Sequence, residues 1–261
     1  MKILLKTAFI LAVFFIKRSS SQATKVPNFE SPYEDYSTLV FIKTSSRVCA
    51  GSVLNSRNIL TAAQCVVNPD VPNNVPLAAS AIQIYYGATN IDMTTLLNAS
   101  ISKIVIHEKY STKVKFSYDI AIIGLDRDVT ITEKVLQEGV YATVKPSATV
   151  DVYAVGVQQK RDLVELTTKM NFNSECQATT KAARQGNPSY TAVTCTKSGK
   201  NANVVCNEDY VGGGIFSTNR RTMIAIILGT TTTSCTPDPT LYVLLIPDKV
   251  AWITNNLIPL S

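Results

Sequence analysis

Short runs of apolar residues recur along the chain, and their length and alternation are typical of β-strands. Runs of this kind occupy residues 39–43, 53–63, 81–86, 102–110, 120–123, 150–157, 163–171, 223–228 and 241–246. Gly, Pro and polar residues separate them, and segment 68–76, which holds three prolines, is predicted to be a surface loop. The pattern therefore predicts an all-β fold made of many short strands.

The C-terminal end departs from this pattern. Val250, Ile253 and Leu257 recur there at helical spacing, and Asp248 stands where a helix N-cap is expected. We therefore expect one terminal helix over residues 248–257.

Residues 1–22 have the composition of a secretory signal peptide. Lys2 and Lys6 precede an apolar run at 7–16, and small polar residues at 19–23 contain the expected cleavage site. The run is shorter than the roughly 20 residues that a membrane-spanning helix needs. The prediction is a secreted, extracellular protein without a membrane partner.

The net charge of +6 comes largely from this leader. The leader holds four of the 25 basic residues and no acidic one, so the other 21 basic and 19 acidic residues leave a net charge of +2. Such a small balance gives no reason to expect a nucleic-acid or polyanion partner.

Residues 48–66 read V-C-A-G-S-V-L-N-S-R-N-I-L-T-A-A-Q-C-V. This segment resembles the first signature of trypsin-like serine proteases, C-G-G-S…W-I-L-T-A-A-H-C-V. Where the family places its catalytic histidine, this chain has Gln64. A carboxamide makes hydrogen bonds but has no useful basicity near neutral pH, so Gln64 cannot replace an imidazole as general base.

A second stretch, S-Y-D-I-A-I-I-G-L over residues 117–125, resembles the D-I-A-L signature of the same family. The resemblance puts Asp119 at the position of the triad aspartate. Its retention alone does not argue for activity, because its own hydrogen bonds can maintain an aspartate there.

The third signature of the family, C-x-G-D-S-G-G-P, is represented by C-N-E-D-Y-V-G-G-G over residues 206–214. Aligned on the cysteine, Tyr210 takes the place of the nucleophilic serine and Glu208 the place of an oxyanion-hole glycine. A phenol cannot reach the same carbonyl from the same turn, and a glutamate adds negative charge where an oxyanion would develop. We expect the Tyr210 ring to fill the cleft; the alternative is an open, non-catalytic pocket.

The resemblance also implies a changed specificity pocket. Trypsin-like members carry an aspartate two residues before the signature cysteine, whereas this chain has Val204 and Val205 there. Valines cannot pair with a lysine or arginine side chain. The chain also lacks the I-V-G-G start of an activated protease, so residues 23–36 are interpreted as a degenerate N-terminal segment.

The family resemblance implies a double six-stranded antiparallel β-barrel with a C-terminal helix. The barrels are expected over about 37–135 and 136–246 of a domain that spans 37–261.

Six cysteines in a secreted chain predict disulfides, and six allow fifteen pairings. The family resemblance selects Cys49–Cys65, Cys176–Cys195 and Cys206–Cys235. No C-x-x-C pair occurs and the chain has a single histidine, His107, so no metal or cofactor is expected. His107 is interpreted as an exposed loop residue, and Asn98 starts an N-glycosylation sequon, Asn-Ala-Ser.

Within the family, residues 102–110 and 118–125 resemble the mite trypsin-like group 3 allergens. Combined loss of base and nucleophile resembles the scabies mite inactivated protease paralogues. This implies a secreted pseudoprotease that binds host proteins, complement components above all, and so interferes with host defence cascades. Two alternatives stay open: an unconventional residual hydrolase, and a decoy that binds protease substrates or inhibitors without turnover.

Overall fold

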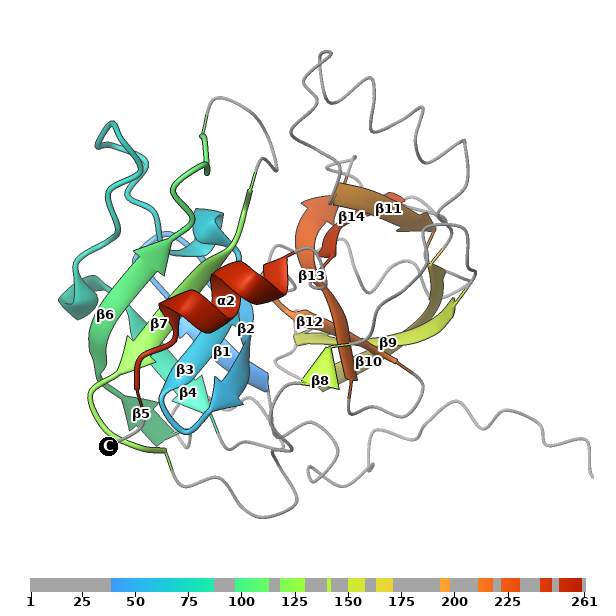
Figure 1. The fold of residues 1–261 in the computed structure, drawn as a ribbon, viewed down its shortest axis with the longest axis horizontal. Coiled ribbons are helices and arrows are strands. Elements are labelled where there is room, and N and C mark those ends of the chain that lie inside the picture. The colour runs from blue at the N-terminus through green and yellow to red at the C-terminus, as the bar shows by residue number, and fades with distance from the viewer. Residues whose placement is uncertain are drawn as a thin grey trace, which may run out of the picture.

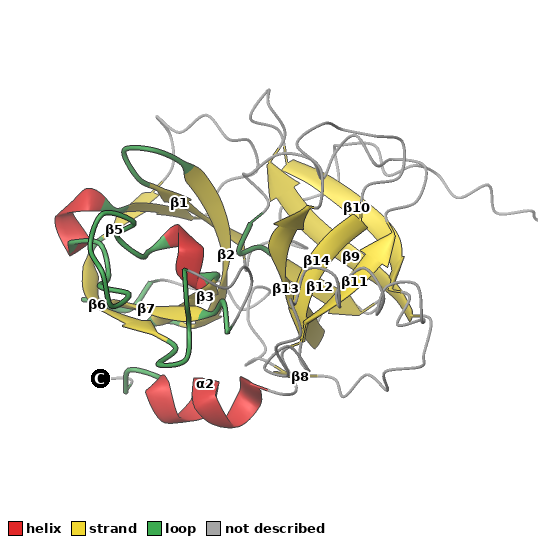
Figure 2. Cartoon of the chain, turned by 90° about the horizontal axis from the view of Figure 1, so that it is seen from above, coloured by secondary structure: helices red, strands yellow, loops and turns green. Residues whose placement is uncertain are grey.

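The computed structural model describes residues 39–86, 97–112, 118–129, 140–141, 150–157, 163–170, 193–197, 211–217, 222–230, 240–245 and 249–259. Two curled sheets stand side by side in it, and one helix crosses the front of the first (Figure 1). Seen from above, each sheet closes toward a barrel (Figure 2). The predicted all-β architecture with a terminal helix is confirmed.

The first sheet has the strand order β5-β4-β1-β2-β3-β7-β6. Its strands are β1 (Leu39–Lys43), β2 (Val48–Asn55), β3 (Asn58–Thr61), β4 (Gln83–Tyr86), β5 (Leu97–Ala99), β6 (Ile101–Ile106) and β7 (Ala121–Leu125). The two strands at its edges, β5 and β6, are separated only by Ser100. β5 and β6 together act as one long strand that pairs with β4 at one end and with β7 at the other, so the seven labelled strands close into a six-stranded barrel.

The second sheet has the order β12-β9-β10-β11-β14-β13-β8, with a further pairing between β12 and β13. Its strands are β8 (Val140–Tyr141), β9 (Val150–Val157), β10 (Leu163–Met170), β11 (Val193–Lys197), β12 (Gly214–Ser217), β13 (Thr222–Thr230) and β14 (Thr240–Leu245). The additional pairing closes six strands into a ring, and β8 joins β13 from outside in parallel orientation.

Most predicted strands form within a few residues of their expected bounds, and the 68–76 segment is a loop closed by a bridge between Val67 and Pro76. Four short strands, β5, β8, β11 and β12, were not predicted, and the predicted run 53–63 is divided between the end of β2 and β3. The four short runs have two to five residues, and two of them contain Ser, Thr or Gly, so they carry little periodicity of their own. Pairing with distant partners makes them strands.

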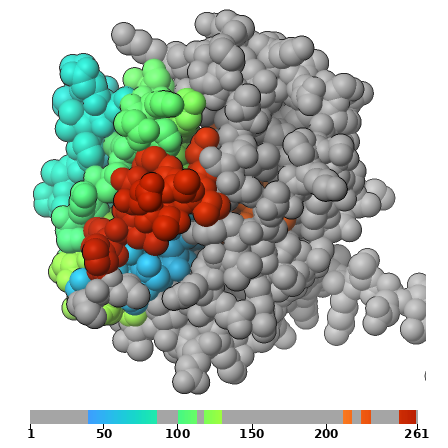
Figure 3. All heavy atoms as spheres, in the orientation of Figure 1, coloured from blue at the N-terminus to red at the C-terminus, as the bar shows by residue number. Residues whose placement is uncertain are grey.

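The terminal helix, α2 (Val250–Asn256), is shorter than expected. It begins after Lys249 without a capping side chain, and Asp248 lies outside the described residues. Ile253 is buried, and Ile258 follows the helix so closely over Gly124 that a Cβ on Gly124 would overlap with it. Figure 3 shows α2 packed on the surface of the first sheet.

The core runs from the first sheet into the second. β3 and β7 are buried along their whole length, and β7 is accordingly apolar throughout, whereas β3 also buries the polar residues Asn58 and Thr61. Val211, Met223, Ile226 and Leu228 join the same cluster from the second half of the chain. The backbone N–H of Ala50 donates to the Val211 carbonyl at 2.8 Å, so the two sheets are fixed against each other beside the candidate site.

In the part of the chain that the structure describes, no helix has the length and apolarity to cross a bilayer. Among the same residues, no three His, Cys, Asp or Glu side chains gather into a metal-binding group.

Candidate functional site

Gln64 lies in a short 3-10 helix, Ala63–Cys65, directly after the buried strand β3. A disulfide between Cys49 and Cys65 ties this turn to β2, as predicted from the family resemblance. Ala62, Ala63 and Cys65 are buried, while Gln64 is half-buried. The backbone around the turn is therefore fixed, and the Gln64 side chain leaves it in a defined direction.

Gln64 and Asp119 are joined by two hydrogen bonds. The Gln64 backbone N–H donates to Asp119 Oδ1 at 2.9 Å, and Gln64 Nε2 donates to Asp119 Oδ2 at 2.6 Å. Nε2 also donates to the carbonyl oxygen of Leu228 in β13, at 2.9 Å. Both partners of that nitrogen are acceptors, which identifies it as the amide NH2. The carboxamide thus links the first sheet to the second.

The Asp119 carboxyl is buried, with 1% of its surface exposed. Burial raises its pKa from 3.8 to about 6, although hydrogen bonds from Gln64 and from the Ala63 backbone, together with the charge of Arg47, favour the ionised form. Desolvation is the largest of these effects. Asp119 therefore exchanges a proton in the mildly acidic range.

Arg47 and Tyr110 complete the surroundings of this pair. Arg47 Nη1 donates to the backbone carbonyl of Gln64 at 3.2 Å. Tyr110 is buried, and burial together with the nearby Asp119 charge raises its pKa. Sequence reasoning missed both residues, and it also missed the Leu228 carbonyl, because none belongs to a signature.

A cavity of about 670 Å³ opens beside Gln64 and Arg47. The loops at 44–47, 68–70 and 110–112 line it, largely with hydroxyl and other polar side chains. The 68–70 wall is held in place because the Asn68 backbone N–H donates to the Val75 carbonyl and Asn74 Nδ2 donates to the Tyr110 carbonyl. Among the described residues, the lining of this shaped, polar entrance comes from the first half of the chain.

Glycine at position 212 is required where the 211–214 segment packs on β2 and β3. Gly212 has a φ of 86°, and a Cβ there would overlap with Thr61 Oγ1 and with the Ala50 carbonyl. Its backbone N–H donates to Ile227 at 2.8 Å, and Gly213 accepts from the Ile227 N–H at 2.9 Å. The 211–214 segment is therefore a tight turn that two backbone hydrogen bonds fix against β13.

Several predicted site residues lie outside the described residues: Tyr210, Glu208, Val204, Val205, Cys176, Cys206 and Cys235. Cys195 belongs to β11, and Asn98 belongs to β5, where it is paired with Tyr85. The specificity pocket, the expected obstruction by Tyr210 and two of the three disulfides therefore stay predictions.

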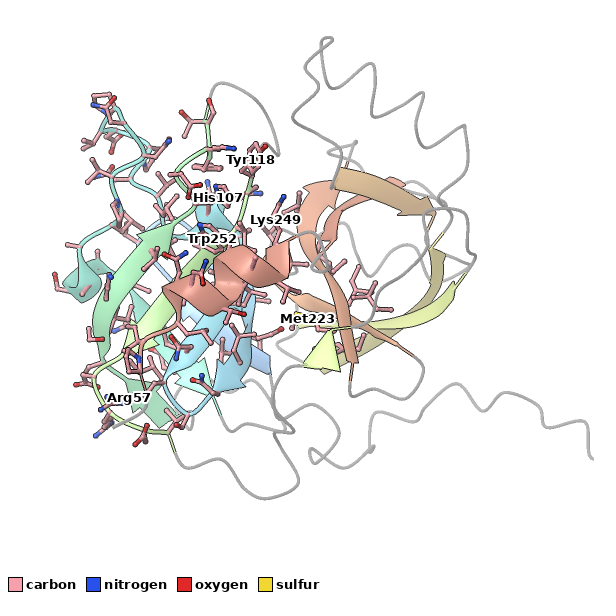
Figure 4. The ribbon with its side chains drawn as sticks, in the orientation of Figure 1. Arg57, His107, Tyr118, Met223, Lys249 and Trp252 are labelled. Atoms are coloured by element: carbon pink, nitrogen blue, oxygen red, sulfur yellow. A yellow bond between two sulfur atoms is a disulfide. The ribbon has the colours of Figure 1, made fainter. Side chains whose placement is uncertain are left out.

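The interpretation of His107 as an exposed loop residue is wrong. Only 5% of its surface is exposed, because α2 covers it. Its ring stacks on Trp252 of α2 and lies against Tyr118 (Figure 4). A partner more than a hundred residues away in sequence buries this side chain, and local sequence gives no sign of such a partner.

Chemically, the described part of the site holds a carboxylate and a neutral amide. Among the described residues, no hydroxyl or thiol side chain is hydrogen-bonded to Gln64 or Asp119. Gln64 offers donors to its neighbours but no lone pair basic enough to accept a proton from a nucleophile. In this geometry the Gln64 amide acts as a hydrogen-bond donor that positions the Asp119 carboxylate.

Comparison with known proteins places this geometry in context. A family model described as Trypsin matches residues 26–253. The chain is 32% identical over 132 residues to the trypsin Tyr p 3.0101 of Tyrophagus putrescentiae, covering 47% of this chain and 44% of that protein. It is also 22% identical to the serine protease SP24D of Anopheles gambiae, covering 84% of this chain and 75% of that protein.

A CLIP domain-containing serine protease, B10 of Anopheles gambiae, is 26% identical over 64% of this chain and 46% of its own length. The chain thus spans less than half the length of several curated relatives that it matches. Among solved structures, mouse neuropsin, a serine protease, has the same fold with a TM-score of 0.64 and 16% identity, covering 85% of this chain and 95% of that one.

Proposed function

Because this chain belongs to the trypsin family, we propose that it is a catalytically inactive member that acts by binding other proteins. The observation that carries this proposal is the Gln64 side chain, which occupies the position of the family's general base and donates to Asp119 and Leu228. A group that already donates to two acceptors and has no basic nitrogen cannot activate a hydroxyl.

The sequence adds a second loss, Tyr210 in place of the nucleophile, and a third, Glu208 in the oxyanion position. Removing one key triad member lowers the turnover of a serine protease by up to about a millionfold. Two such losses leave no residue to which the family's mechanism can be assigned.

The proposed site of action is extracellular and the proposed partners are host complement components. The leader-like residues 1–22 and the Cys49–Cys65 disulfide support secretion. The partner class rests on the resemblance to the scabies mite inactivated paralogues, and the similarity to a mite trypsin supports a relationship to mite proteins of this family. A rigid, disulfide-linked scaffold with surface loops is well suited to such binding.

The test uses the mature, disulfide-bonded chain in two assays. Trypsin-like, chymotrypsin-like and esterase substrates, with a fluorophosphonate probe, are expected to show no turnover and no labelling. A complement activation assay is expected to show inhibition at micromolar protein. Turnover or labelling abolished by a serine-directed inhibitor would overturn the proposed inactivity, and an unchanged complement cascade would overturn the proposed partner.

The cavity beside Gln64 favours a second candidate function, a decoy that holds protease substrates or inhibitors without turnover. In that case binding should depend on the cavity wall. Asp70→Lys, at the exposed rim, is expected to change inhibitor binding at least several-fold if the decoy function is correct. Binding of complement through other loops would leave that variant unaffected.

A further inference from the structure

The chain has one histidine and one tryptophan, and the fold stacks them on each other. The His107 and Trp252 ring centroids are 4.9 Å apart with an interplanar angle of 22°, and the Tyr118 ring lies 4.7 Å from His107. Figure 4 shows these side chains meeting where α2 crosses the first sheet. His107 therefore connects three segments: the turn after β6, the residues before β7, and α2.

A hydrogen bond to the His107 ring determines the tautomer of its neutral form. The Lys109 backbone N–H donates to His107 Nδ1 at 3.1 Å, so Nδ1 carries the lone pair and Nε2 carries the proton. A second proton on Nδ1 would point at this N–H donor and break the bond. The turn itself is held because the His107 N–H donates to the Ile120 carbonyl at 3.2 Å.

The charges that face His107 come from its own turn and from Lys249, which immediately precedes α2. Glu108 has a carboxylate oxygen 3.5 Å from Nδ1, but its side chain is 67% exposed and already accepts the Trp252 Nε1–H at 3.0 Å. The ammonium groups of Lys109 and Lys249 lie 5.6 Å and 4.9 Å from the Tyr118 ring centroid. An added proton would therefore be buried beside two cations.

Burial is the main cause that lowers the His107 pKa below its ordinary value of 6.5. Glu108 opposes this shift, whereas Lys249 and Lys109 add to it. The neutral ring therefore stabilises the packed arrangement fully above pH 6.5, and this stabilisation is lost as the pH falls through the lowered pKa.

We propose that His107 is a proton-operated latch that holds α2 on the first sheet, closed by the neutral ring and opened when the ring is protonated. Opening frees Trp252 from the ring stack and loosens residues 249–259. Opening also changes the surroundings of the candidate site, because Tyr118 directly precedes Asp119. Tyr118 has a φ of 47°, a left-handed conformation that persists only while its packing partners hold it.

Trp252 makes the first test specific, because it is the only tryptophan in the chain. Trp252 leaves the ring stack and gains contact with water when the latch opens, which changes its fluorescence emission, so a pH titration of the full mature chain follows the latch directly. We expect a one-proton transition with a midpoint below 6.5, present in the wild type and in Asp119→Asn. It should be absent in His107→Phe, which keeps an aromatic ring in the stack.

The second test measures backbone hydrogen exchange over residues 249–259, corrected for the intrinsic pH dependence. In the wild type, the corrected exchange rate should rise by up to about tenfold for each unit by which the pH falls through the transition, as one linked proton requires. His107→Asn, whose side chain can still accept the Lys109 N–H in a turn, should exchange faster at every pH without a transition.

Either non-titrating variant is sufficient as the control. A fluorescence transition that persists in His107→Phe or His107→Asn would overturn the proposal. So would exchange over residues 249–259 that stays unchanged across the wild-type transition. None of these outcomes depends on whether the protein binds complement.

Discussion

Gln64 Nε2 lies 2.6 Å from Asp119 Oδ2, so the buried carboxylate keeps a close donor partner although no imidazole is present. The same nitrogen reaches the Leu228 carbonyl in the second sheet. Position 64 is therefore a structural link between the two sheets.

Replacing Gln64 with Ala should destabilise the folded chain by about 2–3 kcal/mol near pH 7.5, because it leaves the buried Asp119 charge without its side-chain donor. The loss should shrink below about pH 5, where Asp119 takes up a proton. Denaturant unfolding followed by circular dichroism measures it. Gln83→Ala, on the exposed side of β4, is the matched control and should change stability by less than about 0.5 kcal/mol. Equal effects from both variants would contradict the link.

Asp119 should make the chain more stable in mild acid. The pKa is about 6 in the folded chain against an ordinary value of 3.8, so the folded state binds this proton more tightly than the unfolded state. The stabilisation is complete below pH 3.8 and is lost as the pH rises through about 6.

This pH dependence is isolated by comparing wild type with Asp119→Asn. The stability of the variant relative to wild type should rise by about 3 kcal/mol between about pH 4 and pH 7, for a difference of about two pKa units. His107 contributes equally to both proteins and cancels in the comparison. A relative stability that is flat with pH would show that the carboxyl titrates normally.

Gly212→Ala should destabilise by more than about 3 kcal/mol, since it combines a left-handed φ with overlap against the Ala50 backbone. Gly124→Ala offers a contrast, because the atoms that its Cβ meets first belong to the flexible Ile258 side chain. A second substitution, Ile258→Ala, should therefore recover much of the Gly124→Ala loss and none of the Gly212→Ala loss. Thermal unfolding of the two double-mutant cycles distinguishes these cases.

Gln64→His should not produce detectable peptidase activity. It supplies an imidazole beside Asp119, but the sequence still has Tyr210 and Glu208 at the other two positions. Fluorogenic peptide assays should stay at background for this variant, and Gln64→His combined with Tyr210→Ser should regain little, because Glu208 places negative charge in the oxyanion position. Strong turnover by the single variant would mean that another nucleophile serves the site.

The sequence by itself determined the strands whose residues are continuously apolar or alternate. β1 and β9 form over the expected residues, and the predicted run 120–123 overlaps β7, a central strand that is buried on both faces and therefore needs apolar residues throughout. The family signatures placed Gln64, Asp119 and the Cys49–Cys65 pair correctly relative to one another. These features are local, or carried by a motif, so a linear pattern contains them.

Only the tertiary structure decided the rest. The Leu228 carbonyl and Arg47 meet at Gln64, and Tyr110 lies near Asp119, because separate segments of the chain bring them there, and a backbone acceptor has no sequence signal. The sequence predicted an exposed His107, whereas in the folded chain Trp252 of α2 covers this side chain. Short strands such as β12 exist because β9 and β13 pair with them on either side. In each case the deciding contact joins residues far apart in the chain, and the free energy of that contact belongs to the packed fold rather than to any local segment.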